Sequence, residues 1–311
     1  MKVFVAGATG AIGRQLVPLL VAAGHEVHGM TRCSSKQALL FELGAVPVVA
    51  DALDGDQVAK AVAEARPDVI VHQLTAIGEV DMRHFDRDFA LTNRLRTEGT
   101  DNLLSAGRAV GVRRFVAQSN GTAPYGRTGE QLKREEDPLD AAPAREMRGM
   151  VAALRHLEQA VLGADWTEGI VLRYGAFYGP GTAMAPGEQV FEMIRKRKFP
   201  LVGDAGAVWS FIHIADAAQA TLAAIEHGSR GIYNIVDDDP APVAEWLPAL
   251  ARQIGAKQPM RIPRFVARLF AGETGVVMMT ELRGASNAKA KHELAWRPAH
   301  PSWRQALALG T

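Results

Sequence analysis

Three glycines near the start of the chain have the spacing that suits binding of a dinucleotide. Gly7, Gly10 and Gly13 follow an apolar run and precede an amphipathic segment. In such a strand–turn–helix the first glycine permits a tight turn, the second lets the backbone approach a pyrophosphate, and the third lets the helix pack against the strand. Free N–H groups at the helix N-terminus favour the phosphates. The expected binding turn comprises Gly7, Thr9, Gly10, Ala11, Ile12 and Gly13.

The residues after the second expected strand favour NADP(H) over NAD(H). A carboxylate about 20 residues beyond the glycine turn would bind the adenosine ribose hydroxyls and repel a 2′-phosphate, whereas an arginine accommodates that phosphate. The chain has Thr31 and Arg32 near this point. Because a guanidinium pairs well with phosphate, we predict that Arg32 contacts the 2′-phosphate. The alternative is that Arg32 is a solvated loop residue.

Two aspartates, Asp51 and Asp54, follow the third expected strand. We expect Asp51, together with Ala52, to border the adenine of the cofactor. Aspartate is also a favoured helix N-cap, and both roles can coexist.

A parallel sheet would bring these segments together. Helical patterns at residues 13–23, 57–65, 97–110 and 150–163 alternate with short apolar runs, which are residues 3–6, 26–30, 47–50, 69–72, 115–118 and 169–172. Strands that alternate with helices predict right-handed crossovers and a doubly wound α/β Rossmann fold. Ligands of such sheets bind at the carboxyl ends of the strands.

The pattern changes after residues 178–181, where proline and glycine become frequent. A helix is expected at residues 212–226 and a late strand at 231–236. From Asp237 onward the chain is mostly helical, with breaks at Pro248, Pro259 and Pro263. We predict a dinucleotide-binding domain at residues 1–176 plus about 207–236, and a smaller C-terminal substrate lobe at about 177–206 plus 237–311.

The order of these motifs resembles the extended short-chain dehydrogenases/reductases, the epimerase/dehydratase branch, over nearly the whole chain. The glycine turn, the strand at 68–76, Asn93 with the helix that follows it, and the segments 172–173 and 211–216 all fit that family's landmarks. The resemblance implies an NAD(P)-binding enzyme. It also implies further cofactor contacts from Leu74, Thr75, Ala76, Asn93, Gln118 and Tyr174.

The chain departs from that family at its catalytic pair, a tyrosine followed four residues later by a lysine. None of the four tyrosines, Tyr125, Tyr174, Tyr178 and Tyr233, has a lysine at that distance. Aligning the expected helix by Glu158 places Met150 and Leu154 in the two positions. The usual proton donor and the charge that tunes it are therefore missing.

The family's third catalytic position, a serine or threonine after the fifth strand, is also altered. Counting from the strand gives Asn120, counting back from Tyr125 gives Gly121, and Ser119 lies beside them. Tyr125 is our first choice for a substitute proton donor, with a packed loop aromatic as the other interpretation. Tyr174, Tyr178 and His213 are further candidates, although a structural role is favoured for Tyr178 and His213. No histidine or acid shows a spacing typical of a metal site.

Composition limits the other classes of function. The 311 residues carry a net charge of +1 and have 48% hydrophobic content, which is typical of a soluble globular protein and gives no electrostatic case for nucleic acid or a membrane surface. Cys33 is the only cysteine, so no disulfide can form within the chain. No apolar run approaches the roughly 18 residues of a membrane span. We expect a cytoplasmic protein with a small-molecule substrate, and a homodimer through helices 97–110 and 150–163 is an option.

Three functions are compatible with these residues. The first is an NADPH-dependent reductase of a small carbonyl or conjugated substrate with a non-standard proton donor. The second is an isomerase, dehydratase or cyclase that shows no net redox change. The third is a non-catalytic protein that senses dinucleotides. The intact cofactor turn and the expected substrate lobe favour the first.

Overall fold

A parallel seven-stranded sheet forms the centre of the molecule in the computed structural model, which describes residues 1–122 and 125–306. The strands are β1 (Lys2–Ala6), β2 (Glu26–Thr31), β3 (Val46–Val49), β4 (Val69–His72), β5 (Arg114–Asn120), β7 (Glu168–Tyr174) and β12 (Gly231–Ile235). Their order is β12-β7-β5-β4-β1-β2-β3. The expected Rossmann fold and its six early strands are confirmed, as is the late strand.

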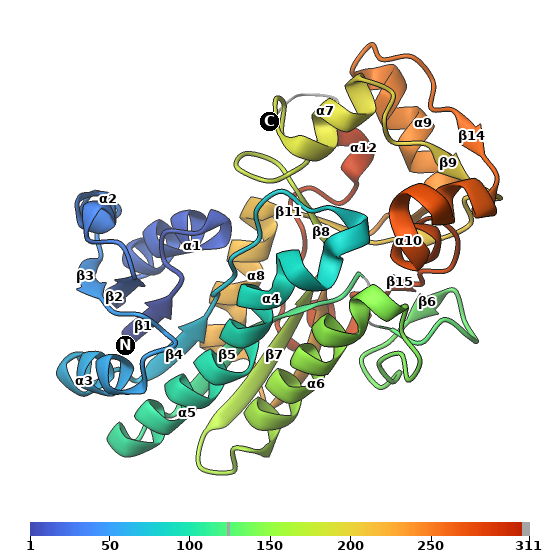
Figure 1. The fold of residues 1–311 in the computed structure, drawn as a ribbon. Coiled ribbons are helices and arrows are strands. Elements are labelled where there is room, and N and C mark those ends of the chain that lie inside the picture. The colour runs from blue at the N-terminus through green and yellow to red at the C-terminus, as the bar shows by residue number, and fades with distance from the viewer. Residues whose placement is uncertain (123–124, 307–311) are drawn as a thin grey trace.

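Helices cover both faces of the sheet (Figure 1). Along β1, Val3 and Val5 point into one apolar cluster while Phe4 and Ala6 point into another, as period-two strands buried on both faces require. The first cluster is closed by α1 (Ala11–Ala22), α2 (Gln37–Glu42) and α8 (Ile214–His227). The second is closed by α3 (Gly55–Ala65), α4 (Phe85–Arg96), α5 (Glu98–Val110) and α6 (Arg148–Gly163).

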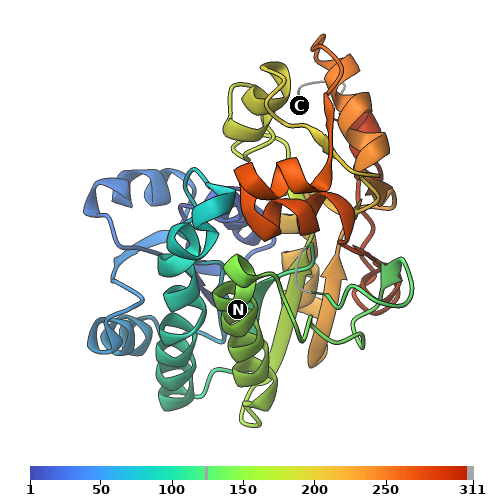
Figure 2. The ribbon, with the colours of Figure 1, turned by 45° about the vertical axis from the view of Figure 1, so that its right-hand side comes forward.

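A third apolar cluster lies beyond the sheet and joins the upper turns of α4 and α6 to the later part of the chain. It is built around α9 (Val243–Gln253), whose Trp246 is fully buried. The other helices of this region are α7 (Gln189–Arg195), α10 (Arg264–Thr280) and α12 (Trp303–Ala306), whereas α11 (Ala288–Glu293) packs on the first cluster through Ala290. Figure 2 shows α10 standing above the upper ends of α4 and α6. The predicted division into two domains stays a prediction, and residues 307–311 lie outside the described part.

Short strand pairs connect this region, and the sequence pattern did not reveal them. They are β8 (Ala176–Tyr178) with β11 (Phe211–His213), β9 (Leu201–Val202) with β14 (Arg261–Ile262), β10 (Val208–Trp209) with β13 (Ala241–Pro242), and β6 (Leu132–Lys133) with β15 (Gly284–Ala285). Three short 3₁₀ turns complete the described elements, η1 (Ser34–Lys36), η2 (Met82–His84) and η3 (Arg145–Met147).

Two expectations about this region need correction. Residues 211–213 form a strand, so the helix expected at 212–226 begins only at Ile214. Pro248 does not break the chain but lies inside α9. Proline removes one helical hydrogen bond, yet Trp246, Leu247 and Leu250 bury one side of this helix, and such packing is the main source of helix stability in proteins.

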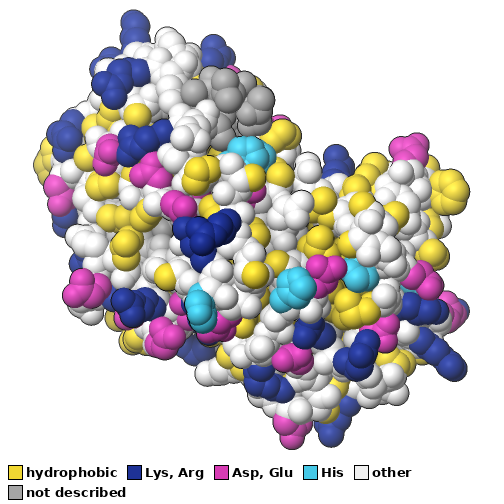
Figure 3. Space-filling view, turned by 180° about the vertical axis from the view of Figure 1, so that it is seen from behind, with side chains coloured by type: hydrophobic (Ala, Val, Ile, Leu, Met, Phe, Trp, Pro, Cys, Tyr) yellow, Lys and Arg dark blue, Asp and Glu magenta, His cyan; other side chains and the backbone are white. Residues whose placement is uncertain are grey.

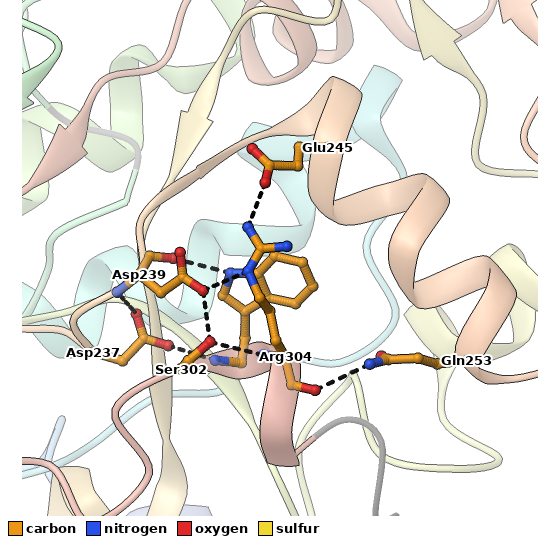
Figure 4. A network of polar contacts seen from close by, with 7 residues as sticks. Asp237, Asp239, Glu245, Gln253, Ser302 and Arg304 are labelled. Carbon is orange, nitrogen blue, oxygen red and sulfur yellow. Dashed lines mark hydrogen bonds and ion pairs between the residues drawn. The ribbon is translucent and has the colours of Figure 1, made fainter.

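Polar contacts hold the last described helix against this region (Figure 4). Arg304 on α12 donates to Asp239 at 2.7 Å, and Ser302 donates to the same carboxylate at 2.6 Å. Trp303 is fully buried between these contacts and donates its backbone N–H to Asp237. The last described residues thereby become part of the third apolar cluster.

Charged side chains of both signs are interspersed on the face shown in Figure 3. Among the described residues, no helix is long and apolar enough to cross a bilayer.

Candidate functional site

The glycine turn between β1 and α1 has the close contacts that only glycine permits. Gly7 has φ +93°, and a Cβ on it would lie 2.7 Å from the carbonyl oxygen of Gln73. A Cβ on Gly13 would lie 2.5 Å from the carbonyl of Ala8. Gly10 begins the helix, and its N–H donates to the carbonyl of Gly7 at 3.0 Å. The glycines thus allow the close backbone packing that a pyrophosphate-binding turn requires.

The N-terminus of α1 is open to an anion. Its N-cap, Gly10, has no side chain to satisfy the first N–H groups, and the first turn contains no acidic residue. Exposed Arg14 follows directly, and its Nε donates to the carbonyl of Thr9 at 3.1 Å. Arg14 was not among the predicted site residues, although a cation immediately after the third glycine is a usable signal for a phosphate site.

The end of β2 places a cation where an NAD-specific protein would have an acid. Thr31 is buried and its hydroxyl accepts the N–H of Cys33 at 3.2 Å. Arg32 and Lys36 are exposed, and no acidic residue stands between them. This arrangement fits a phosphorylated ribose, and the contact of Arg32 with it stays a prediction.

The sequence left two roles open for the aspartates after β3, namely helix N-cap and contact with the adenine. Asp54 is the N-cap of α3 and accepts the N–H groups of Asp56 and Gln57. Asp51 is half-buried, and its carboxylate accepts the N–H of Leu53 at 3.0 Å. Ala52 is buried, and its carbonyl accepts a hydrogen bond from Asn102. The N-cap role therefore belongs to Asp54, and the contact of Asp51 with an adenine stays a prediction.

The segment after β4 runs along the same edge of the sheet. Leu74 and Ala76 are half-buried and Thr75 is exposed. The N–H of Ala76 donates to Thr92 on α4, and the N–H of Leu74 donates to His72. These contacts fix the backbone beside the glycine turn, because Gly7 packs on the carbonyl of Gln73.

Tyr174 is surrounded by protein in this structure, and its predicted contact with the cofactor stays a prediction. It is 1% exposed, and its hydroxyl contacts Gln73 at 3.1 Å and Thr221 at 2.6 Å. Burial raises the pKa of Tyr174 to about 12. This hydroxyl contacts Gln73, the residue that follows β4. Neither its burial nor its pKa favours proton transfer.

Ser119 and Tyr125 belong to one buried polar network. Arg173 on β7 forms a two-pronged ion pair with Glu158 on α6, at 2.8 and 2.6 Å. Ser119 donates to Glu158 at 2.7 Å. Tyr125 donates to Asn234 at 2.6 Å and accepts from Arg173 at 2.8 Å. The sequence did not reveal this network, since its members are far apart along the chain.

This network leaves little freedom for either hydroxyl to act on a substrate. The protons of Ser119 and Tyr125 are both committed to protein acceptors. Burial raises the pKa of Tyr125 to about 12, which weakens it as an acid. Gln118 and Asn120 are half-buried at the end of β5, and Asn120 accepts the N–H of Thr122. The catalytic assignments to Ser119, Asn120 and Tyr125 remain untested predictions, and the geometry does not favour Tyr125.

The two positions that alignment by Glu158 assigns to the family's tyrosine and lysine lie in apolar surroundings. Met150 is 1% exposed and Leu154 is 0% exposed, and both belong to the third apolar cluster with Phe89 and Tyr178. Neither can hold or release a proton. Ser119, beside the third position of the usual set, donates its proton to Glu158. The described part of the site therefore offers no evident protein acid.

His213, Asp216 and His300 form the metal-capable cluster found among the described residues, with ligand atoms within 4.8 Å of one another. Asp216 already accepts the N–H groups of Ala299 and His300, at 3.0 and 2.8 Å. His213 accepts the N–H of Ala215 through Nδ1, as the N-cap of α8. These bonds give the cluster a structural purpose, which is to join α8 to the segment at 299–300.

Comparison with known proteins agrees with this fold. Residues 3–236 match the model of the NAD dependent epimerase/dehydratase family. The chain is 43% identical to a 3-diazoavenalumate denitrifying reductase of a Streptomyces species, over 99% of both chains.

Solved structures of related fold cover essentially the whole chain. UDP-glucose 4-epimerase of Thermotoga maritima superposes with a TM-score of 0.79 at 22% identity, covering 100% of this chain and 97% of that one. A human epimerase family protein solved with NADPH gives 0.74 at 22% identity, covering 99% and 98%. The chain therefore belongs to the NAD dependent epimerase/dehydratase family and is an enzyme that works with a nicotinamide dinucleotide.

Proposed function

We propose that the protein is an NADPH-dependent reductase of substrates that accept hydride without a protein acid, with arenediazonium compounds as the substrate class. The observation that carries this proposal is the apolar burial of Met150 and Leu154, which removes the family's acid. The 43% identical relative, named as a denitrifying reductase of a diazo compound, supports the substrate class.

The chemistry of the acceptor explains why an acid can be absent. A ketone reduced by hydride also needs a proton on oxygen, and a positioned acid accelerates such transfer by about 10²–10⁴-fold. On a diazonium carbon, the hydride that the bound cofactor supplies forms a C–H bond while the C–N bond breaks and N₂ leaves with its electron pair, so no proton is needed.

The chain's own residues would bind and shield such a substrate. Met150, Leu154 and Phe89 are packed in the third apolar cluster, so these positions present neither a hydroxyl nor an ammonium group. An arenediazonium ion is destroyed by water and by phenolate nucleophiles. A site without an ionisable tyrosine at its centre, and with the remaining tyrosines buried and bonded, avoids the second reaction.

The preference for NADPH rests on the cations near the adenosine end. Arg32 is exposed after β2, Lys36 stands four residues later, and Arg14 lies at the glycine turn. A phosphate carries charge that a guanidinium can bind with two parallel hydrogen bonds. No carboxylate stands at the end of β2 to repel it.

Turnover with paired substrates tests the proposal. The purified protein is given NADPH with an arenediazonium salt or with the aryl ketone of the same skeleton, and the rate without protein is subtracted. The expected result is one N₂ released per NADPH consumed, with the ketone left unchanged. Efficient reduction of the ketone would contradict the proposal. Conversion of a substrate without loss of NADPH would instead favour an epimerase-like or dehydratase-like reaction.

A further inference from the structure

Arg96, the last residue of α4, is a buried cation without a counter-ion. Arg96 is 3% exposed, and Nη1 of its guanidinium has no hydrogen-bond partner. Within the described residues its guanidinium makes no ion pair. Burial lowers the pKa of Arg96 to about 10, which still leaves it charged at neutral pH.

A lone buried charge is unfavourable for folding. Water solvates an exposed guanidinium, and a protein interior does so only through hydrogen bonds and opposite charges. Buried Arg173 follows this rule through its ion pair with Glu158. Arg96 breaks it, and groups that are strained in this way gather at functional sites.

The position of Arg96 connects it to the missing lysine. The helices α4 and α6 lie side by side in Figures 1 and 2. They run in the same direction, because their first turns enter the third apolar cluster while Leu95 and Leu157 enter the cluster beneath the sheet. A Cβ on Gly149 would lie 3.3 Å from Nδ2 of Asn93. On α4, Arg96 follows Asn93 by three residues. On α6, Leu154 follows Gly149 by five residues.

Arg96 also lies near the end of β4. Its charge contributes to the lowered pKa of His72, the last residue of that strand, after the dominant effect of burial. The neighbouring Leu95 carbonyl lies 3.2 Å from Nε2 of His72. Arg96 thus lies near the carboxyl end of β4, and ligands of this fold bind at the carboxyl ends of the strands.

Two buried acceptors in the same region also lack partners. Oδ1 of Asn93, one turn before Arg96, has no hydrogen bond to a described residue, and neither does Oε1 of Gln73 after β4. An unpartnered donor and an unpartnered acceptor on adjacent turns complement a ligand hydroxyl, which both accepts and donates a hydrogen bond.

We propose that Arg96, with Asn93, binds the ribose on the nicotinamide side of the cofactor and thereby takes over the binding role of the lysine that Leu154 replaces. The proposal deepens the proposed function and rests on it only for the identity of the ligand. Arg96 supplies no proton, so it replaces the lysine in binding and not in tuning an acid.

Stability and binding, measured together, test this assignment. Arg96→Met keeps the length of the side chain and removes the charge. We expect its apo form to melt at the same temperature as the wild type or higher, because an unpaired buried charge is lost. We expect its Kd for NADPH to rise by about 10- to 100-fold, as for loss of a charged hydrogen bond. Arg96→Lys, which keeps a cation, should lose much less affinity.

Two ligands and a control variant show which part of the cofactor Arg96 contacts. ADP-ribose and ADP differ only in the second ribose, so Arg96→Met should weaken ADP-ribose and leave ADP unchanged. Arg94→Met alters an exposed arginine on the same helix that pairs with Glu98 and should bind all ligands normally. If Arg96→Met does not fold, Arg96→Gln carries the same comparison.

Three results would overturn the assignment. The first is unchanged NADPH affinity in Arg96→Met, which would leave the proposed reductase intact. The second is an equal loss for ADP and ADP-ribose, which would move the contact to the phosphates. The third is a wild-type protein that binds none of these ligands, which would end the proposed function as well.

Discussion

At the scale of single residues, the buried ion pair of Arg173 and Glu158 organises the end of β5. The pair is almost fully buried, and it draws in Ser119 and Tyr125. A pair of this kind adds little net stability over apolar packing, but removing one partner leaves the other charge uncompensated. Its purpose here is to fix the position of the end of β5.

Glu158→Gln should therefore be strongly destabilising. The change removes the counter-charge of Arg173, and the expected loss in the free energy of unfolding is about 3–5 kcal/mol. Chemical denaturation measures it. Glu98→Gln, which breaks the exposed pair with Arg94, serves as the control and should cost about 1 kcal/mol or less. Equal effects of the two variants would contradict the structural role.

His72 should make the protein less stable in mild acid. Burial lowers the pKa of His72 from 6.5 to about 4. Between these values the unfolded chain binds more protons than the folded one, so the free energy of unfolding decreases as pH falls from about 6.5 to about 4. The slope is at most about 1.4 kcal/mol per pH unit.

Denaturation at pH 7 and pH 5 measures this contribution. His72→Asn, which cannot take up a proton, should lose less stability than the wild type over that interval. The same loss in both proteins would show that His72 does not titrate in this range.

At the scale of elements, the packing of α1 on the glycine turn sets the cofactor site. A Cβ on Gly13 would meet the Ala8 carbonyl at 2.5 Å, and that backbone cannot move aside cheaply. Gly13→Ala should push the helix away from β1, lower stability by about 1–3 kcal/mol and weaken NADPH binding at least tenfold. Calorimetric titration and denaturation provide the two values.

Gly163→Ala is the matched control for that change. Gly163 ends α6, and a Cβ on it would meet no described atom within 4 Å, so alanine there should leave both values unchanged. If Gly13→Ala behaves like Gly163→Ala, then close packing at the turn is not what positions the phosphates.

The sequence predicted the elements whose signals are local. The glycine turn, the buried strands and the cap at Asp54 each depend on a few neighbouring residues, and all are present. The short pairs such as β9 with β14 were missed, because two-residue strands carry no period. Arg96 was missed for another reason: only burial distinguishes it from Arg94 two residues earlier, which is exposed and paired.

At the scale of the whole molecule, the sheet and the later elements share α4 and α6. Phe85, Phe89, Met150 and Leu154 enter the third apolar cluster, while the lower turns of the same helices enter the cluster under the sheet. Met150 and Leu154, which we assign to the family's catalytic positions, therefore lie where two cores meet.

Ligand-induced stabilisation should report the cofactor preference of the whole protein. A ligand that binds only the folded state stabilises it by RT ln(1 + [L]/Kd). NADPH should raise the melting temperature more than NADH at equal concentration, and Arg32→Ala should reduce that difference without altering the apo protein. Arg113→Ala, which alters an exposed arginine paired with Asp68, is the control. An unchanged preference in Arg32→Ala would place phosphate recognition elsewhere.

The origin of the hydrogen in the product tests the central claim most directly, namely that hydride goes to a carbon that needs no acid. The reaction with an arenediazonium salt is run once with NADPH deuterated at the nicotinamide C4 in H₂O, and once with unlabelled NADPH in D₂O. The account predicts that the arene carbon which lost N₂ carries deuterium in the first reaction and hydrogen in the second. Deuterium taken from the solvent at that carbon would contradict it, because it would require a proton donor in the site.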